Sequence, residues 1–312
     1  ETKPWEQRNT FNGININSDD VLGLALADKI GFSAVRYHWL LWGNSQLFSG
    51  AHKAPGLFDW AIADKVFAAM SENKMSFMVN IFGSPKWALP DEFQGVTGGM
   101  VAGGMKYNGY GVQNQNYVRD FFNAYLERYG ERTDIIEFWN EPGSSSAFWY
   151  DHDNDDVLIL MLKTVSECVK NYNREHSADI KIAFAGFMPT QTAWLEKFMS
   201  SDADIGKYYD IFSIHGNYSA PAEIYEKLLT NTGIEKKPWI NSESYSTSIN
   251  YARSGSEKLT DFSLNSLSGL MNYFYHIKAG ASQLYDFRTT CDIDDEYAAA
   301  LARNGIYTEY WG

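Results

Sequence analysis

The chain has 312 residues, of which 45% are hydrophobic and 21% charged, as in ordinary soluble globular proteins. Its 39 acidic residues outnumber its 26 basic residues, and the net charge of −13 disfavours nucleic acid or an anionic membrane as the main partner. Every apolar run is shorter than the roughly 18 residues that a membrane-spanning helix needs, so no membrane insertion is expected.

Short β-rich runs alternate with helical patterns along the whole chain, which is typical of a parallel α/β sheet. The predicted strands are residues 11–17, 34–40, 76–82, 135–140, 181–187, 211–215, 239–242 and 282–287. The predicted helices are residues 19–30, 59–73, 114–129, 155–175, 191–199, 221–229 and 258–278. Eight strands with seven intervening helices predict an α/β protein, a single-domain (β/α)8 TIM barrel spanning residues 1–312.

The least regular stretch is residues 83–113, which follows the third predicted strand and contains the sequence GVTGGMVAGGMKYNGYG. Its glycines disfavour a packed element, so we expect a long Gly-rich βα loop at the barrel mouth. After the eighth strand only residues 294–302 have a helical pattern. A full closing helix is therefore not predicted.

Two glutamates stand at predicted strand ends, Glu141 after the fourth strand and Glu243 after the seventh. Catalytic groups of such barrels lie at the carboxyl ends of the strands, so both side chains are expected on one rim. Glycosidic bond cleavage needs two carboxyl groups, one to protonate the leaving oxygen and one that is ionised. Each glutamate, taken singly, could instead be a solvated loop residue.

The segment Trp139-Asn140-Glu141-Pro142 resembles the strand-four signature of the clan A retaining glycoside hydrolases. Several further matches resemble family 39, which contains β-xylosidases and α-iduronidases: Arg36-x-His38, Phe58-Asp59-Trp60 with Asp64, Ser84-Pro85-Lys86-Trp87-Ala88, and Glu137 two residues before Trp139. The resemblance implies that Glu141 is the general acid/base and that Asn140 binds the sugar 2-hydroxyl. Pro238 to Glu243 resembles the strand-seven segment of the clan, in which the glutamate is the nucleophile.

The resemblance implies hydrolysis of β-linked glycosides of an oligo- or polysaccharide with retention of configuration. It also implies a carbohydrate partner and no metal or cofactor. A secreted or periplasmic location is expected. Two departures from family 39 affect the exact family and substrate. Ser244 replaces the aromatic residue that often follows the nucleophile, and Tyr285 to Arg288 replace the tryptophan common at the end of strand eight.

Neighbouring polar residues receive supporting roles in this interpretation. Arg36 would keep Glu243 ionised, because an opposite charge lowers the pKa of a carboxyl group, although pairing with Glu137 remains open. His38 and His215 could bind substrate hydroxyls or orient the glutamates. Tyr218 or Tyr245 could donate a hydrogen bond to the nucleophile oxygen. Each of these four side chains could instead be an ordinary packed or satisfied polar residue.

The conformation around Glu141 can also be predicted. Strand alternation would place Glu137, Trp139 and Glu141 on one side, with Glu137 deeper as a structural carboxylate. Pro142 would hold Glu141 extended, because the residue before a proline avoids the helical region.

Three tryptophans fall in predicted loops near the rim, where an indole face could stack on a pyranose ring. These are Trp42, Trp87 and Trp149, and core or loop packing is the alternative for each.

The acidic runs 151–156 and 292–296 lack the glycine and terminal glutamate of an EF-hand and are interpreted as helix starts. Cys168 lies on the apolar face of a helix, which favours a buried free thiol.

Three alternative functions remain. The same glutamate pair could transfer the sugar to another hydroxyl, as in a transglycosylase. A barrel could also bind carbohydrate without cleaving it, although such a protein has no need for an acid/base pair. A metal-dependent or Schiff-base barrel is the least favoured, because no His/Asp ligand cluster and no strand-end lysine is evident. The identity of the sugar and the choice between endo and exo cleavage stay open.

Overall fold

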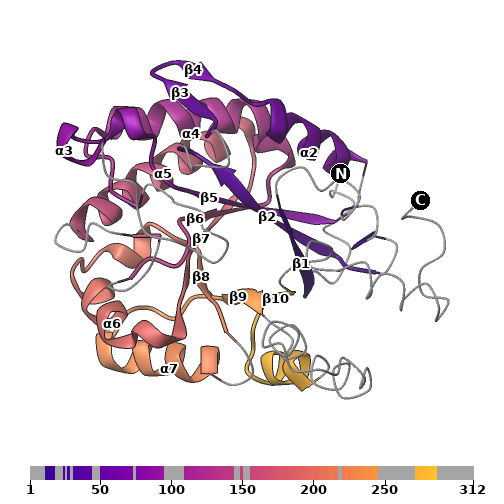
Figure 1. The fold of residues 1–312 in the computed structure, drawn as a ribbon. Coiled ribbons are helices and arrows are strands. Elements are labelled where there is room, and N and C mark those ends of the chain that lie inside the picture. The colour runs from indigo at the N-terminus through magenta and orange to yellow at the C-terminus, as the bar shows by residue number, and fades with distance from the viewer. Residues whose placement is uncertain are drawn as a thin grey trace, which may run out of the picture.

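The computed structural model describes residues 11–17, 24, 27–28, 31–43, 50–72, 75–94, 109–143, 148–149, 155–216, 220–244 and 271–286. Eight parallel strands form a closed barrel, in which each strand pairs with two neighbours (Figure 1). Around the ring they are β1 (Asn12–Asn17), β2 (Ala34–Leu41), β5 (Ser76–Phe82), β6 (Ile135–Phe138), β7 (Lys181–Phe187), β8 (Ile211–Ile214), β9 (Trp239–Ser244) and β10 (Gln283–Asp286). The predicted TIM barrel is confirmed, including its eighth strand.

The described helices lie on the outside of the barrel (Figure 1). They are α2 (Ala61–Ser71), α3 (Asp91–Gln94), α4 (Gln115–Tyr129), α5 (Asp155–His176), α6 (Thr192–Ser200) and α7 (Ala220–Thr232), and residues 271–278 are also helical. The predicted helix 19–30 is described only at Leu24, Ala27 and Asp28, which are helical. No helix among the described residues has the length and apolarity that crossing a membrane requires.

Helix α4 illustrates why the outer shell forms. Its buried residues recur at helical spacing from Val118 to Tyr129, so one apolar face covers the barrel. The Asn114 side chain accepts a hydrogen bond from the backbone N–H of Asn116 and caps the helix start. The aromatic rings of Phe121 and Phe122 pack against each other and against neighbouring aromatic side chains.

The segment after β5 is more structured than the predicted loop 83–113. Its described part contains a 3-10 turn (Lys86–Ala88) and the short helix α3, while residues 95–108 lie outside the described residues. A small antiparallel hairpin, β3 (His52–Ala54) and β4 (Leu57–Phe58), follows β2 and was not predicted. The predicted helix 294–302 also lies outside the described residues.

Inward-facing side chains fill the barrel in two layers of different chemistry. The lower layer is an apolar cluster with one residue from each of six strands: Ala34, Met78, Ile135, Ala183, Ile240 and Tyr285. Two residues further along their strands, Arg36, Asn80, Glu137 and Ser242 form the upper layer, together with Ser213 of β8. This two-residue step is the strand period, so the upper layer carries polar groups towards the carboxyl ends of the strands.

Candidate active site

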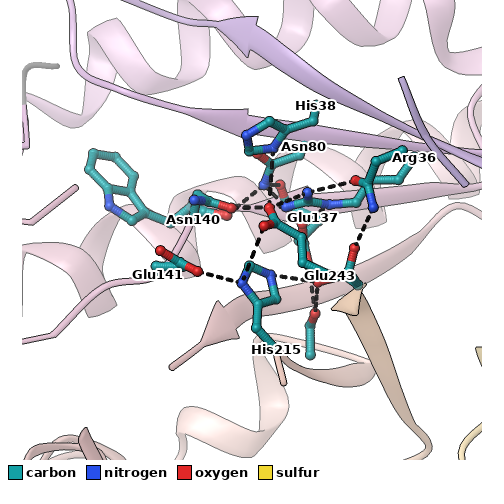
Figure 2. A network of polar contacts seen from close by, with 12 residues as sticks. Arg36, His38, Asn80, Glu137, Asn140, Glu141, His215 and Glu243 are labelled. Carbon is teal, nitrogen blue, oxygen red and sulfur yellow. Dashed lines mark hydrogen bonds and ion pairs between the residues drawn. The ribbon is translucent and has the colours of Figure 1, made fainter. Parts of the chain in front are cut away.

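Arg36 lies at the centre of the upper layer and is fully buried. Its Nε donates to Glu137 Oε2 at 2.7 Å, and one terminal nitrogen donates to Glu243 Oε1 at 2.7 Å and to Asn15 Oδ1 at 2.9 Å. The other terminal nitrogen donates to Asn140 Oδ1 at 2.9 Å. The two alternatives from the sequence are therefore both realised, because Arg36 pairs with Glu137 and with Glu243 at once (Figure 2).

Glu137 is the deep carboxylate of this network and is also fully buried. Its Oε2 accepts hydrogen bonds from Arg36 and from Asn80 Nδ2, and its Oε1 accepts one from Ser213 Oγ at 2.5 Å. Burial alone would raise the pKa of Glu137, but the positive charge of Arg36 and the hydrogen bonds outweigh it and lower the pKa. Glu137 is therefore an ionised structural carboxylate, as the strand position predicted.

Glu243 reaches the same network from β9, where the strand is irregular. Between the partners Leu284–Asn241 and Asp286–Ser244, β9 has two residues where β10 has one. This bulge allows Ser242 and Glu243 both to point into the barrel, whereas strict alternation would turn one of them outward. Burial raises the pKa of Glu243, and the charges of His215 and Arg36 oppose this increase.

Glu141 stands higher on the rim, after β6 has ended at Phe138. Its backbone φ is +44°, so the prediction that Pro142 holds it extended is wrong. Trp139 also has a positive φ of +71°, and its indole is buried among aromatic rings with its Nε1 donating to the Phe148 carbonyl. The predicted alternation of Glu137, Trp139 and Glu141 therefore fails, because the strand ends at Phe138 and the backbone leaves the extended conformation at Trp139.

One carboxylate oxygen of Glu141, one of Glu243 and one ring nitrogen of His215 all lie within 4.8 Å of one another. The side chain of Glu141 is 19% exposed and that of Glu243 is 5% exposed. Figure 2 shows His215 between the two glutamates. The structure thus brings the two predicted carboxylates together, with the less buried one at the mouth.

His215 follows β8 and contacts both glutamates. Its Nδ1 lies 2.7 Å from Glu141 Oε1 and 3.8 Å from Glu243 Oε2. Gly186 lies directly against the ring, because a Cβ there would approach His215 Nε2 to 2.4 Å. Burial lowers the pKa of His215, but the negative charges of Glu243 and Glu141 outweigh it and raise the pKa above its usual value.

Asn140 and His38 are the remaining predicted site residues close to the glutamates. Asn140 is buried and its carboxamide oxygen accepts from Arg36, so the guanidinium holds it beside Glu141. His38 stacks on Phe82, and its Nδ1 lies 3.7 Å from Glu243 Oε1. Their contact with a sugar stays a prediction. Tyr218 and Tyr245 lie outside the described residues.

The three candidate tryptophans do not form a sugar platform together. Trp42 is fully buried, donates to His52 Nδ1 at 3.1 Å and packs on α4. Trp149 is also fully buried and donates to Asp155 Oδ1 at 3.1 Å. The assignment of Trp42 and Trp149 to substrate stacking is corrected, because neither indole has an accessible face. Trp87 is half-buried, donates to the His52 carbonyl and packs edge-on against Tyr117.

Four network residues were not predicted as part of the site: Asn15, Asn80, Ser213 and Ser242. Asn80 and Ser242 lie two residues after an apolar residue of the lower layer, so the strand period could have identified them. Small polar residues are common at strand ends, and no motif distinguished these four.

Glu141, His215 and Glu243 could geometrically offer three ligand atoms to a metal ion. The guanidinium of Arg36 already lies 2.7 Å from Glu243 Oε1 and is permanently charged. His215 Nδ1 is likewise engaged with Glu141 Oε1 at 2.7 Å, so these ligand atoms already have protein partners and we assign no metal ligands here.

No protein family and no curated protein matches this sequence. Solved structures do match the fold. A monomeric β-xylosidase from Caulobacter crescentus aligns with 93% of this chain at 14% identity and a TM-score of 0.63. A family 39 glycoside hydrolase from Bacteroides cellulosilyticus aligns with 95% of the chain at 15% identity and a TM-score of 0.63.

The chain spans 62% of the length of that β-xylosidase and 59% of the length of that family 39 enzyme. A family 10 xylanase from Bispora, solved with xylobiose, aligns with 96% of this chain and 89% of its own, at 8% identity and a TM-score of 0.58. These similarities show that the chain shares the TIM-barrel fold with glycoside hydrolases of families 39 and 10.

Proposed function

We propose that this protein is a retaining glycoside hydrolase that cleaves β-linked glycosidic bonds of an oligo- or polysaccharide. The observation that carries the proposal is the approach of Glu141 and Glu243, since one carboxylate oxygen of each lies within 4.8 Å of the other. Retaining enzymes hold their two carboxyl groups about 5–5.5 Å apart, whereas inverting enzymes leave room for a water molecule at about 6.5–9.5 Å. The spacing therefore supports a double displacement.

In the proposed first step Glu243 attacks the anomeric carbon and forms a covalent glycosyl-enzyme. The bond to the leaving oxygen breaks, and Glu141 transfers its proton to that oxygen. In the second step Glu141 takes a proton from a water molecule. The oxygen of this water attacks the anomeric carbon, and the bond to Glu243 breaks with retention of configuration.

The environments of the two carboxyl groups support this division of roles. Glu243 is the more buried and receives a charge-assisted hydrogen bond from Arg36 at 2.7 Å, which favours the anion needed for attack. Glu141 is the more exposed and lies at the mouth, where a leaving group can depart into solvent. Arg36 in turn is fixed by Glu137, so the nucleophile is held by a buried and rigid pair.

The substrate class is proposed from the same site and from the structural neighbours. The neighbours are named as a β-xylosidase, a family 39 hydrolase and a xylanase. We therefore propose β-xylosides as the first substrates to examine, followed by other β-linked pyranosides.

A panel of aryl β-glycosides and polysaccharides tests the proposal with wild type, Glu141→Gln, Glu243→Gln and the matched control Glu167→Gln. Glu167 is 46% exposed on α5 and contacts Arg119. Both site variants are expected to lose at least about a hundredfold in kcat, because each removes one acid/base or nucleophile function. Proton NMR of the first-formed product should show the β-anomer. Undiminished turnover in either site variant, or an α-anomer as first product, refutes the proposal.

A further inference from the structure

A chain of hydrogen bonds runs beneath the two glutamates and joins Glu137 to His215. Ser213 Oγ lies 2.5 Å from Glu137 Oε1, Ser242 Oγ lies 2.8 Å from Ser213 Oγ, and His215 Nε2 lies 3.0 Å from Ser242 Oγ. All four side chains are almost completely buried. The other ring nitrogen of His215 lies 2.7 Å from Glu141, the proposed acid/base.

The direction of these hydrogen bonds follows from the charge at the lower end. Glu137 is ionised beside Arg36, and a carboxylate only accepts hydrogen bonds, so the Ser213 hydroxyl donates to it. The Ser213 oxygen then accepts from the Ser242 hydroxyl, and the Ser242 oxygen accepts from His215 Nε2. All the hydrogen bonds of this series can therefore form together only when His215 carries a proton on Nε2.

We propose that Ser213 and Ser242 are positioning residues that hold the proton of His215 on Nε2 and thereby keep the ring as an imidazolium that donates from Nδ1 to Glu141. The inference rests on the proposed glycosidase function for its role in the reaction. A neutral ring with its proton on Nε2 would turn the Nδ1 lone pair towards Glu141 Oε1, which is repulsive unless Oε1 itself carries the proton of the acid. That proton would then point to the ring and not to the leaving oxygen. A neutral ring with its proton on Nδ1 would instead lose the hydrogen bond that Nε2 donates to the Ser242 hydroxyl oxygen. Both alternatives are penalised, so the protonated ring is favoured.

The charged groups around His215 agree with this assignment. Among the described residues, Glu141 after β6, Glu243 on β9 and Glu137 on β6 act on the ring with negative charge, and Arg36 on β2 opposes them. The balance raises the pKa of His215.

The consequence for the reaction concerns the two oxygens of Glu141. Oε1 is occupied by the Nδ1–H of His215, so the proton for the leaving oxygen is carried by Oε2. When Oε2 has given up this proton, the imidazolium stabilises the remaining carboxylate until water returns a proton to it. His215 itself keeps both of its protons throughout, so the step is balanced between Glu141, the leaving group and water.

Nitrogen-15 NMR of the imidazole rings in ligand-free wild-type protein tests the proton placement without any assay of activity. The spectrum is assigned with His215→Gln. We expect Nε2 of His215 to stay protonated across the titration while Nδ1 loses its proton at a pH above the usual histidine value. A neutral ring with its proton on Nδ1 overturns the proposal, and this result is independent of whether the protein is a glycosidase.

The serine variants test the link to catalysis. Ser213→Ala and Ser242→Ala are expected to move the basic limb of the kcat/KM profile about one pH unit lower, because the imidazolium loses its acceptor chain. On the alkaline side kcat/KM then falls about tenfold, while values on the acid side stay near wild type. Ser242→Thr should restore the profile. An unchanged basic limb in both alanine variants refutes the proposal.

Ser166→Ala is the matched control, since Ser166 is a buried serine of α5 whose Oγ has no hydrogen-bond partner among the described residues. Its pH profile should equal that of wild type. If the alanine variants fail to fold, the wild-type NMR titration still decides the proposal. If wild type hydrolyses none of the glycosides, the proposed function fails while the NMR result stands.

Discussion

The two layers inside the barrel share four strands, β2, β5, β6 and β9, and differ in their chemistry. In the lower layer Ala34, Met78 and Ile135 pack as an apolar cluster with three further residues. Two residues higher, the corresponding positions are Arg36, Asn80 and Glu137, which are joined by hydrogen bonds. The difference shows that one strand period separates a layer without charged side chains from a layer that assembles the proposed site.

The upper layer is tolerated because its charges are paired. Removing a charge from a buried pair costs more than removing an exposed one, since the partner is left without compensation. The lower layer contains no charged side chain, so a substitution there lowers the free energy of unfolding through the side-chain volume that it removes. Variants in the two layers should therefore differ in what they change, and this contrast can be measured.

The largest effect is expected for Arg36→Met, which leaves Glu137 and Glu243 buried without their cation. We expect a loss of about 3–5 kcal/mol in the free energy of unfolding, measured with denaturant. Arg128→Met is the matched control, because the Arg128 side chain is 47% exposed in its ion pair with Asp64. It should cost less than about 1 kcal/mol. Equal losses in the two variants would contradict the paired upper layer.

A smaller and purely structural effect is expected for Met78→Ala in the lower layer. The cavity should cost about 2–5 kcal/mol, depending on how far the neighbouring side chains relax. The KM and the pH dependence of the surviving activity should equal those of wild type, because Met78 pairs with Arg36 through the backbone and the substitution leaves the backbone groups in place. A shifted pH profile in this variant would mean that the two layers do not act separately.

The smallest effect is expected in the pH profile of kcat/KM, through the ionisation of Glu243. Burial raises the pKa of Glu243 above its usual 4.5, and this group must be ionised to attack. The acidic limb of the pH profile of kcat/KM, measured with an activated aryl glycoside, should therefore have its midpoint above pH 4.5. Glu141→Gln should move the limb to lower pH, because the negative charge of Glu141 contributes to raising the pKa of Glu243. A limb that moves upward would contradict the proposed coupling.

Much of the fold could be predicted because periodicity is a local property. The strands from 11–17 to 282–287 alternate or form buried runs, and all eight were found in the barrel. The β3–β4 hairpin was missed because its strands are only three and two residues long. Such short segments have no measurable period.

The two glutamates could be predicted from their places at strand ends, but their conformations could not. Alternation assumes a regular strand, and it fails where Trp139 and Glu141 adopt positive φ and where β9 bulges before Glu243. These irregularities depend on tertiary contacts such as the hydrogen bond from the Glu141 N–H to the Ala185 carbonyl. No pattern within the strand reveals them.

The tryptophans show that side-chain contacts with distant elements cannot be predicted from the local sequence either. Trp42 and Trp149 follow strands and lie near the predicted rim, which makes them candidates for sugar stacking. Each indole instead finds a buried acceptor, His52 for Trp42 and Asp155 for Trp149. The position of these acceptors depends on the hairpin and on α5, so it could not be read from the neighbouring residues.

The central claim is that Glu243 forms a covalent bond to the sugar, and trapping this intermediate tests it most directly. The protein is incubated with an activated 2-deoxy-2-fluoro-β-xyloside, and its intact mass and peptide map are measured. We predict a mass increase of one fluoroxylosyl group that maps to Glu243 and is absent in Glu243→Gln. Attachment to Glu141 or to any other residue, in a protein that hydrolyses β-xylosides, would contradict the account.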